Sequence, residues 1–391
     1  MRKFWYNAAL LLMAVSLSTM TACDDDDDEV QSSVSTSTDD EDTTDDEETT
    51  DDEDTTDEEE TTTVTITEGV YIINTGNYNA NNGSIQWYDP ADETISEDLF
   101  ETANGKGIGD AQDLIVYGSK VYITCSSSAK IEIVNREDFS IAETINLAND
   151  EGEAIKARYL TADGGYVYFT AYDGTVNKID TASLAITESL ELGEGTYPEA
   201  LSAANGKLYI NISGYGSGNT IAVVDIASFT LTGELEVALD PYDVNFLADD
   251  GKVYFTSMGD YGYTTCATLQ CIDPETDEVT TICNASKAAV HDGKIYFISA
   301  DYYSSDPGVI GVYDTATGSS STFADYDSFT GSPQFIAVDP VSGDVYIGNY
   351  SYSSLNDVYV YSSDGEFMTS FETGWYTTNV RFVTTETTVT E

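Results

Sequence analysis

Any chemistry in this sequence must come from carboxylates and phenols, because the chain holds 71 Asp and Glu and 28 Tyr but one histidine, His291. That histidine lies beside a predicted tight turn, so we expect no His-based metal site, no Ser-His-Asp relay and no histidine base. The paired acids of a glycosidase remain conceivable, with Asp113, Glu199 and Asp243 as candidates. Carboxylates are so abundant in this chain that the presence of three candidates is weak evidence for a catalytic pair. We expect a binding protein that is not an enzyme and has no cofactor or metal.

A stronger functional signal is tyrosine on predicted loops, among Ser, Gly and Asn. Rigid aromatic side chains on loops provide amphipathic contact area at a low entropy cost, as in antibody binding sites. The loop candidates for ligand binding are Tyr78, Tyr172, Tyr215, Tyr261, Tyr263, Tyr302, Tyr303, Tyr350, Tyr352 and Trp375. Residues expected where innermost strands meet a central channel add Gln112, Asp113, Arg158, Tyr159, Asp243 and Gln334, with Glu199 and Asn379 at similar places.

The elements that must position these residues are given by an internal repeat. A strand of the form apolar-Tyr-apolar recurs seven times, 41 to 51 residues apart, with its tyrosine at Tyr71, Tyr122, Tyr168, Tyr209, Tyr254, Tyr296 and Tyr346. Each copy is followed by two more short strands, and a fourth precedes the next copy. Four strands per repeat of this length are typical of a propeller blade. The sequence therefore predicts an all-β fold, a seven-bladed β-propeller with four-stranded antiparallel blades.

The chain ends predict how the ring closes. Residues 69–73 form a tyrosine strand with no innermost strand before it, and residues 379–383 form an innermost strand with no tyrosine strand after it. We expect the two to pair, so that the first blade is completed by both chain ends and leaves no open edge.

Strand alternation predicts two unlike faces. With strands named a to d outward from the axis, the a–b and c–d turns share one face and are short, as at Gly118–Lys120 and Asp180–Ser183. We call this the plain face. The b–c and d–a loops share the other face and carry the tyrosines, and we call it the Tyr-rich face.

The first 23 residues predict export. Arg2 and Lys3 precede an apolar stretch of residues 8–17, too short for the ~20 residues of a membrane-spanning helix. The Met20-Thr21-Ala22-Cys23 sequence resembles a lipobox, which implies a signal peptide over 1–22 and lipidation of Cys23, held in the outer membrane by its acyl chains. Residues 24–29 are all acidic and resemble a surface-export tag, although they could simply begin a solvated tether.

Residues 23–63 are expected to be a disordered stalk behind the lipidated cysteine, because residues 24–63 hold 22 acidic residues and no aromatic ones. The propeller is assigned to residues 64–391. The net charge of −57 argues against nucleic acid or anionic lipid as partners. Cys125, Cys266, Cys271 and Cys283 could be free or form disulfides, and the sequence leaves both open.

Residues 69–89, 109–123 and 158–176 resemble the YncE-like propeller lipoproteins grouped as DUF5074. The resemblance implies a surface-exposed, outer-membrane lipoprotein that binds a ligand. Some members of that broad group capture cobalamin for a TonB-dependent transporter and others have no assigned ligand, so the resemblance implies a corrinoid of the vitamin B12 type, or a similar nutrient, as ligand. A glycan, or a partner protein in adhesion, would suit the same tyrosines, and both stay as alternatives.

Overall fold

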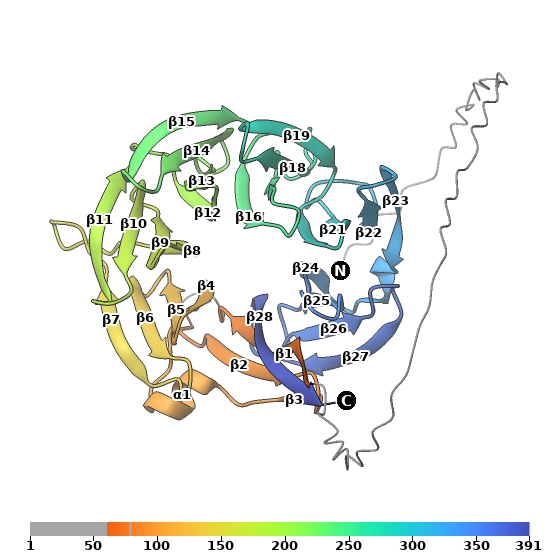
Figure 1. Cartoon of the computed structure of the whole chain (residues 1–391). Helices are drawn as coiled ribbons and strands as arrows, with labels where there is room; N and C mark the ends of the chain where they lie inside the picture. Colours follow the sequence, from red (N-terminus) through yellow and green to blue (C-terminus); the bar gives the residue numbers. More distant parts are fainter. Residues whose placement is uncertain (1–60, 78–79, 391) are drawn as a thin grey trace, which may run out of the picture. The chain divides into compact units, whose positions relative to one another are not determined.

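The computed structural model describes residues 61–77 and 80–390. The predicted signal peptide, Cys23, residues 24–60 and the candidate Tyr78 lie outside the described residues. The described chain is built from seven antiparallel sheets of four strands each, arranged as blades around an axis (Figure 1). The predicted seven-bladed propeller is therefore confirmed, and the chain belongs to the all-β class.

Six blades each come from one continuous stretch of chain, with the strands in order a to d. Blades 2 to 4 consist of β4 (Asp113–Tyr117), β5 (Lys120–Cys125), β6 (Lys130–Asn135), β7 (Ile141–Asn146); β8 (Ala157–Asp163), β9 (Tyr166–Ala171), β10 (Thr175–Asp180), β11 (Ala185–Glu191); and β12 (Pro198–Ala204), β13 (Lys207–Ile212), β14 (Thr220–Asp225), β15 (Thr230–Glu236). Blades 5 to 7 consist of β16 (Pro241–Leu247), β17 (Val253–Ser257), β18 (Thr268–Asp273), β19 (Glu278–Cys283); β20 (Lys287–His291), β21 (Lys294–Ser299), β22 (Val309–Asp314), β23 (Ser319–Ala324); and β24 (Ser332–Val338), β25 (Val345–Tyr350), β26 (Asp357–Tyr361), β27 (Phe367–Glu372).

Blade 1 closes the ring with both chain ends, as predicted. Its order is β28 (Thr377–Thr390), β1 (Thr61–Asn74), β2 (Ser84–Asp89) and β3 (Thr94–Ile95). Both closing strands are longer than the expected 69–73 and 379–383, since pairing continues from Asn74↔Thr377 to Thr61↔Thr390. Because β28 runs toward the a–b turns, residues 61–67 and 384–390 form a ribbon that extends from the plain face. Alternating Thr, Val and Ile favour this strand pairing over a disordered chain.

The outer part of blade 1 departs from the repeat. Strand β3 has two residues, and the helix α1 (Leu99–Asn104) follows it. Asp98 caps α1 by accepting from the Phe100 N–H at 3.0 Å, and Gly105 ends it in the left-handed conformation at φ 66°. Phe100 is fully buried and packs in the same cluster as Tyr71. No helix in the described part of the chain is long and apolar enough to span a membrane.

The core lies between neighbouring blades and is organised by the repeated tyrosines. All seven tyrosines of the b strands are buried, none more than 3% exposed. The c–d turns are held by carboxylates at the strand ends, as where Asp180 accepts from the Ser183 N–H at 2.7 Å. Four cysteines within the described residues are free, so no disulfide joins them. Ring rigidity therefore comes from packing and strand pairing.

Candidate functional site

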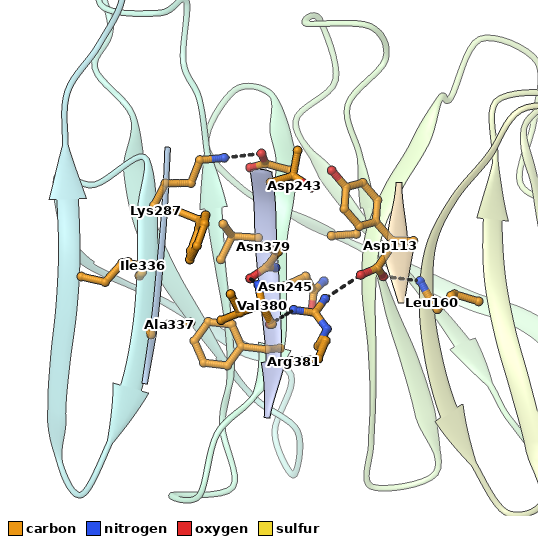
Figure 2. Close-up of a pocket in the computed structure, with 18 of the residues that line it drawn as sticks. Asp113, Leu160, Asp243, Asn245, Lys287, Ile336, Ala337, Asn379, Val380 and Arg381 are labelled. Carbon is orange, nitrogen blue, oxygen red and sulfur yellow. Dashed lines mark hydrogen bonds and ion pairs between the residues drawn. The ribbon is translucent and has the colours of Figure 1, made fainter. Parts of the chain in front are cut away.

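The seven innermost strands enclose a channel with a volume of about 590 Å³, and every one of them contributes to its lining (Figure 2). This size lies within the ~300–1,000 Å³ usual for small-molecule sites. Residues at the strand starts, such as Arg158 and Asp243, are polar and form the mouth at the Tyr-rich face. Toward the plain face the lining becomes apolar, with Val338 and Phe382 among its residues. The polar chemistry is thus concentrated at one end.

A buried network around Arg158 forms one side of the mouth. The Arg158 Nε donates to Glu199 Oε2 at 2.8 Å, and its Nη1 donates to Gln112 Oε1 at 2.7 Å. The Tyr172 hydroxyl donates to Glu199 Oε1 at 2.5 Å, and the Gln112 amide donates to the Tyr159 hydroxyl at 3.3 Å. The guanidinium also lies 4.6 Å from the Tyr172 ring centroid. These contacts hold each side chain in one orientation.

Two further ion pairs lie in the channel, and Figure 2 shows Lys287–Asp243 nearer the mouth and Arg381–Asp113 deeper. Lys287 pairs with Asp243 Oδ2, while Asp243 Oδ1 has no hydrogen-bond partner among the described residues. Arg381 Nη2 donates to Asp113 Oδ1 at 2.6 Å, and Asp113 Oδ2 accepts from the Leu160 N–H at 2.9 Å. Asp243 Oδ1 is itself buried, so a ligand would meet the exposed part of the Lys287–Asp243 pair.

The charges at the mouth are balanced. Three bases, Arg158, Lys287 and Arg381, each pair with one acid from a neighbouring innermost strand. They are three of only 14 Lys and Arg in a chain of net charge −57. The mouth therefore offers many hydrogen-bonding groups with no excess charge, which suits an uncharged polar ligand.

Burial shifts the protonation of the acids near the mouth. It raises the pKa of Glu199 to about 7, against the opposing effect of Arg158 and the hydrogen bonds from Tyr172 and Arg158. Burial also raises the pKa of Asp240 to about 6, although the nearby Tyr261 hydroxyl acts in the opposite direction. Asp240 is 1% exposed, and within the described residues neither of its carboxylate oxygens accepts a hydrogen bond. Both carboxylates therefore lie out of contact with water beside the mouth.

The tyrosines of this face form two rows that begin at the mouth. The Tyr215 row has ring centroids 5.5 Å apart between Tyr172 and Tyr197 and 5.3 Å apart between Tyr197 and Tyr215. The Tyr352 row has centroids 4.8 Å apart between Tyr376 and Tyr350 and 4.7 Å apart between Tyr350 and Tyr352. Each row starts at the channel lining or its network and ends at an exposed ring.

A third group, the Tyr302 cluster, consists of Tyr263, Tyr302 and Tyr303 and lies on the loops of blades 5 and 6. Its ring centroids are 6.4 Å apart between Tyr263 and Tyr303 and 4.8 Å apart between Tyr302 and Tyr303. The exposed fractions are 62% to 81%. The Tyr303 N–H donates to the Tyr261 carbonyl at 2.7 Å, which ties the cluster to the loop that borders Asp240.

The sequence candidates therefore fall into two groups. Gln112, Asp113, Arg158, Tyr159, Asp243 and Gln334 line the channel together, as does Asn379. The loop candidates Tyr172, Tyr215, Tyr261, Tyr263, Tyr302, Tyr303, Tyr350, Tyr352 and Trp375 lie outside the lining. His291 ends β20 beside an a–b turn, on the plain face as expected. Within the described residues, no group of three or more His, Cys, Asp or Glu is placed to hold a metal ion.

Sequence reasoning missed several residues of the mouth. Tyr242, Lys287 and Arg381 all line the channel, and Tyr197 joins the Tyr215 row. The signal that could have found Lys287 is its position within the predicted strand. Lys287 begins β20 as Asp113 begins β4, so an alignment of the seven repeats would have selected it.

Comparison with known families agrees with this architecture. The model of a domain of unknown function, DUF5074, matches residues 68–382. The chain belongs to the DUF5074 family. No curated protein matches the sequence.

Solved structures share the fold with this DUF5074 protein at low sequence identity. Kuenenia stuttgartiensis hydrazine synthase is 15% identical, with a TM-score of 0.53 over 65% of this chain and 77% of that one. The computationally designed Ika8 protein is 12% identical, with a TM-score of 0.52 over 79% and 89%. The dihydro-heme d1 dehydrogenase NirN is 12% identical, with a TM-score of 0.55 over 80% and 66%. At these identities the similarity concerns the fold alone.

Proposed function

We propose that this DUF5074 protein is a lipid-anchored lipoprotein of the outer surface that binds an uncharged polar ligand at the channel mouth, without catalysing a reaction. The observation that carries the proposal is the mouth itself. Three balanced ion pairs present fixed donors and acceptors there, and two rows of tyrosines begin beside them. Fixed polar groups among aromatic rings are typical of small-molecule sites.

A corrinoid is the first ligand to test, and its delivery to a TonB-dependent transporter is the corresponding role. Its peripheral amides are uncharged donors and acceptors, which match the paired side chains of the channel. Its flat ring offers apolar surface for tyrosines. The family resemblance supports the same ligand class.

A glycan or a protein partner in adhesion is the second candidate, and the Tyr302 cluster favours it. These rings lie away from the channel lining, and Tyr302 is 81% exposed. Rings exposed to this extent could stack on sugar faces or fill a pocket of a partner protein.

Calorimetric titration tests the proposal on the full-length chain in detergent, with cyanocobalamin and neutral oligosaccharides as probes. We expect one probe to bind, and the Lys287→Met, Asp243→Asn double variant to weaken it at least ~10-fold, because hydrogen bonds to charged groups contribute ~1.5–3 kcal/mol. The matched control is Lys178→Met, Glu188→Gln, an ion pair on β10 and β11 away from the mouth. Unchanged affinity in the mouth variant, or no binding of any probe by the wild type, would overturn the proposal.

A further inference from the structure

The two tyrosine rows lie on opposite sides of the channel mouth. The Tyr215 row belongs to the junction of blades 3 and 4, because Tyr172 follows β9, Tyr197 precedes β12 and Tyr215 follows β13. The Tyr352 row belongs to the junction of blades 7 and 1, since Tyr350 ends β25 and Tyr376 precedes β28. Three blades separate the junctions on one side of the ring and four on the other. A ligand seated only inside the channel would have no use for either outer end.

The backbone that carries Tyr215 is strained. Gly214, Tyr215 and Gly216 have successive φ values of 53°, 56° and 89°, and a bulky residue in this left-handed region is uncommon. Three N–H groups, from Gly216, Ser217 and Gly218, converge on the Ser213 carbonyl at 2.7–3.1 Å and fix the turn.

Packing does not account for a tyrosine at this position, because the Tyr215 side chain is 78% exposed. Phe229 gives the contrast. It also has a positive φ of 49°, but it is 6% exposed and packs between blades, so burial explains its presence.

Tyr376, at the inner end of the Tyr352 row, also has a backbone in the left-handed region. Tyr376 has a φ of 53° and lines the channel, and its side chain is 37% exposed. The Thr75 N–H donates to its carbonyl at 3.0 Å, which fixes the loop against blade 1. Strained backbone conformations that are not offset by burial of the side chain are found mostly at functional sites.

We propose that one ligand spans the channel mouth from the Tyr215 row to the Tyr352 row, and that the strained turns hold both rows in position before it binds. The inference rests on the proposed function. The ligand it requires is uncharged, wider than the channel and edged with hydrogen-bonding groups, which describes a corrinoid or a neutral oligosaccharide. Holding the rows in advance lowers the entropy cost of binding.

Thermal unfolding of the full-length chain tests the strain without any ligand. Asparagine tolerates the left-handed region, so Tyr215→Asn should raise the melting temperature by about 1–2 °C. Phe229→Asn, the matched control on the plain face, should lower it by several degrees because it removes a buried ring. If the Tyr215→Asn variant melts below the wild type, the backbone at Tyr215 is not strained and the proposal that strained turns hold the rows is wrong.

Titration with cyanocobalamin, and separately with a neutral oligosaccharide, tests the span and distinguishes the two ligand sources. Tyr215→Asn and Tyr352→Ala should each weaken the bound probe about tenfold, and the double variant about 100-fold, because distant sites act additively. Phe367→Ala, which removes a 56% exposed ring at the start of β27, should leave affinity unchanged. If the wild type binds a probe and only one row matters, the span is wrong although the proposed function stands. If the wild type binds neither, the proposed function fails first.

Discussion

Single residues at the mouth work in pairs that the linear sequence does not show. Arg381 and Asp113 are 268 positions apart, yet they form a 2.6 Å hydrogen bond because ring closure places their strands side by side. Arg158 and Glu199 are 41 positions apart and pair because blades 3 and 4 follow each other in the chain and lie side by side. The candidate acids were selected from the sequence by strand position, but their basic partners Lys287 and Arg381 were not. Lys287 begins its strand as Asp113 does, whereas Arg381 lies inside β28 and nothing local to it indicates a partner.

Asp240 makes a prediction about pH. Its pKa is raised from 3.8 to about 6 by burial, so its contribution to stability is complete below pH 3.8 and is lost as the pH rises through 6. Asp240→Asn removes the charge and keeps a residue that tolerates the φ of 59°. The variant should match the wild type near pH 4 and exceed it by about 1–3 kcal/mol at pH 8.

Thermal melts of both proteins at pH 4 and pH 8 measure this difference. Comparison of the two proteins at each pH cancels the titration of the many surface carboxylates. The same difference in melting temperature at both values would show that Asp240 is not the titrating group.

At the scale of elements, the ion pairs join the innermost strands two by two. Arg381 and Asp113 join blades 1 and 2, Arg158 and Glu199 join blades 3 and 4, and Lys287 and Asp243 join blades 5 and 6. Blade 7 contributes the neutral Gln334 to the channel lining. The mouth is thus part of the scaffold, and its geometry depends on a closed ring.

The closing strand β28 gives the prediction at this scale. Removing residues 377–390 takes the innermost strand from blade 1, opens the ring and breaks the Arg381–Asp113 pair. Removing only residues 384–390 shortens the ribbon and leaves the blade complete. We expect the longer deletion to abolish cooperative unfolding or lower the melting temperature by more than 10 °C, roughly ten times the effect of the shorter one.

Thermal melts of the two truncations decide this, with a deletion of residues 30–60 as a control that touches no blade. Similar melting temperatures for the two C-terminal truncations would contradict the structural role of β28.

The repeat made the blades predictable, because a buried tyrosine marks every b strand and short turns mark every strand end. The exceptions were elements that depend on context. The Thr-rich residues 61–67 form a strand only because 384–390 pair with them, and α1 replaces most of the fourth strand of blade 1 through the Asp98 cap. Tyr172, Tyr215, Tyr350 and Tyr352 were predicted as loop residues and Tyr197 was not, and the order of the rows across the mouth depends on the ring.

At the scale of the whole molecule, the anchor is proposed from residues 1–29. Cys23→Ala should abolish lipidation, and deletion of residues 24–29 should keep lipidation but lose surface exposure. Metabolic labelling with a palmitate analogue reports the first, and digestion of intact cells by added protease reports the second. If protease digests the deletion protein as readily as the wild type, the acidic run is a tether and not an export tag.

The two faces of the ring are the central contrast of the molecule. Folding alone explains the tight turns of the plain face. On the Tyr-rich face, Tyr215, Tyr263, Tyr302 and Tyr352 are all more than three-quarters exposed, at 78% to 87%, and packing explains none of them. The proposed binding role supplies a cause, because rigid aromatic anchors usually dominate such interfaces.

The most direct test compares affinity after disabling each face in the full-length chain. The triple change Tyr261→Ala, Tyr302→Ala and Tyr350→Ala should weaken the bound probe at least ~30-fold, the factor that corresponds to ~2 kcal/mol for a lost hot spot. The matched triple change at Lys120, Lys252 and Lys294 to Ala, beside the a–b turns, should leave affinity nearly unchanged. Calorimetric titration of both variants gives the answer. Loss of binding in the lysine variant with retention in the tyrosine variant would place the site on the plain face and contradict this account.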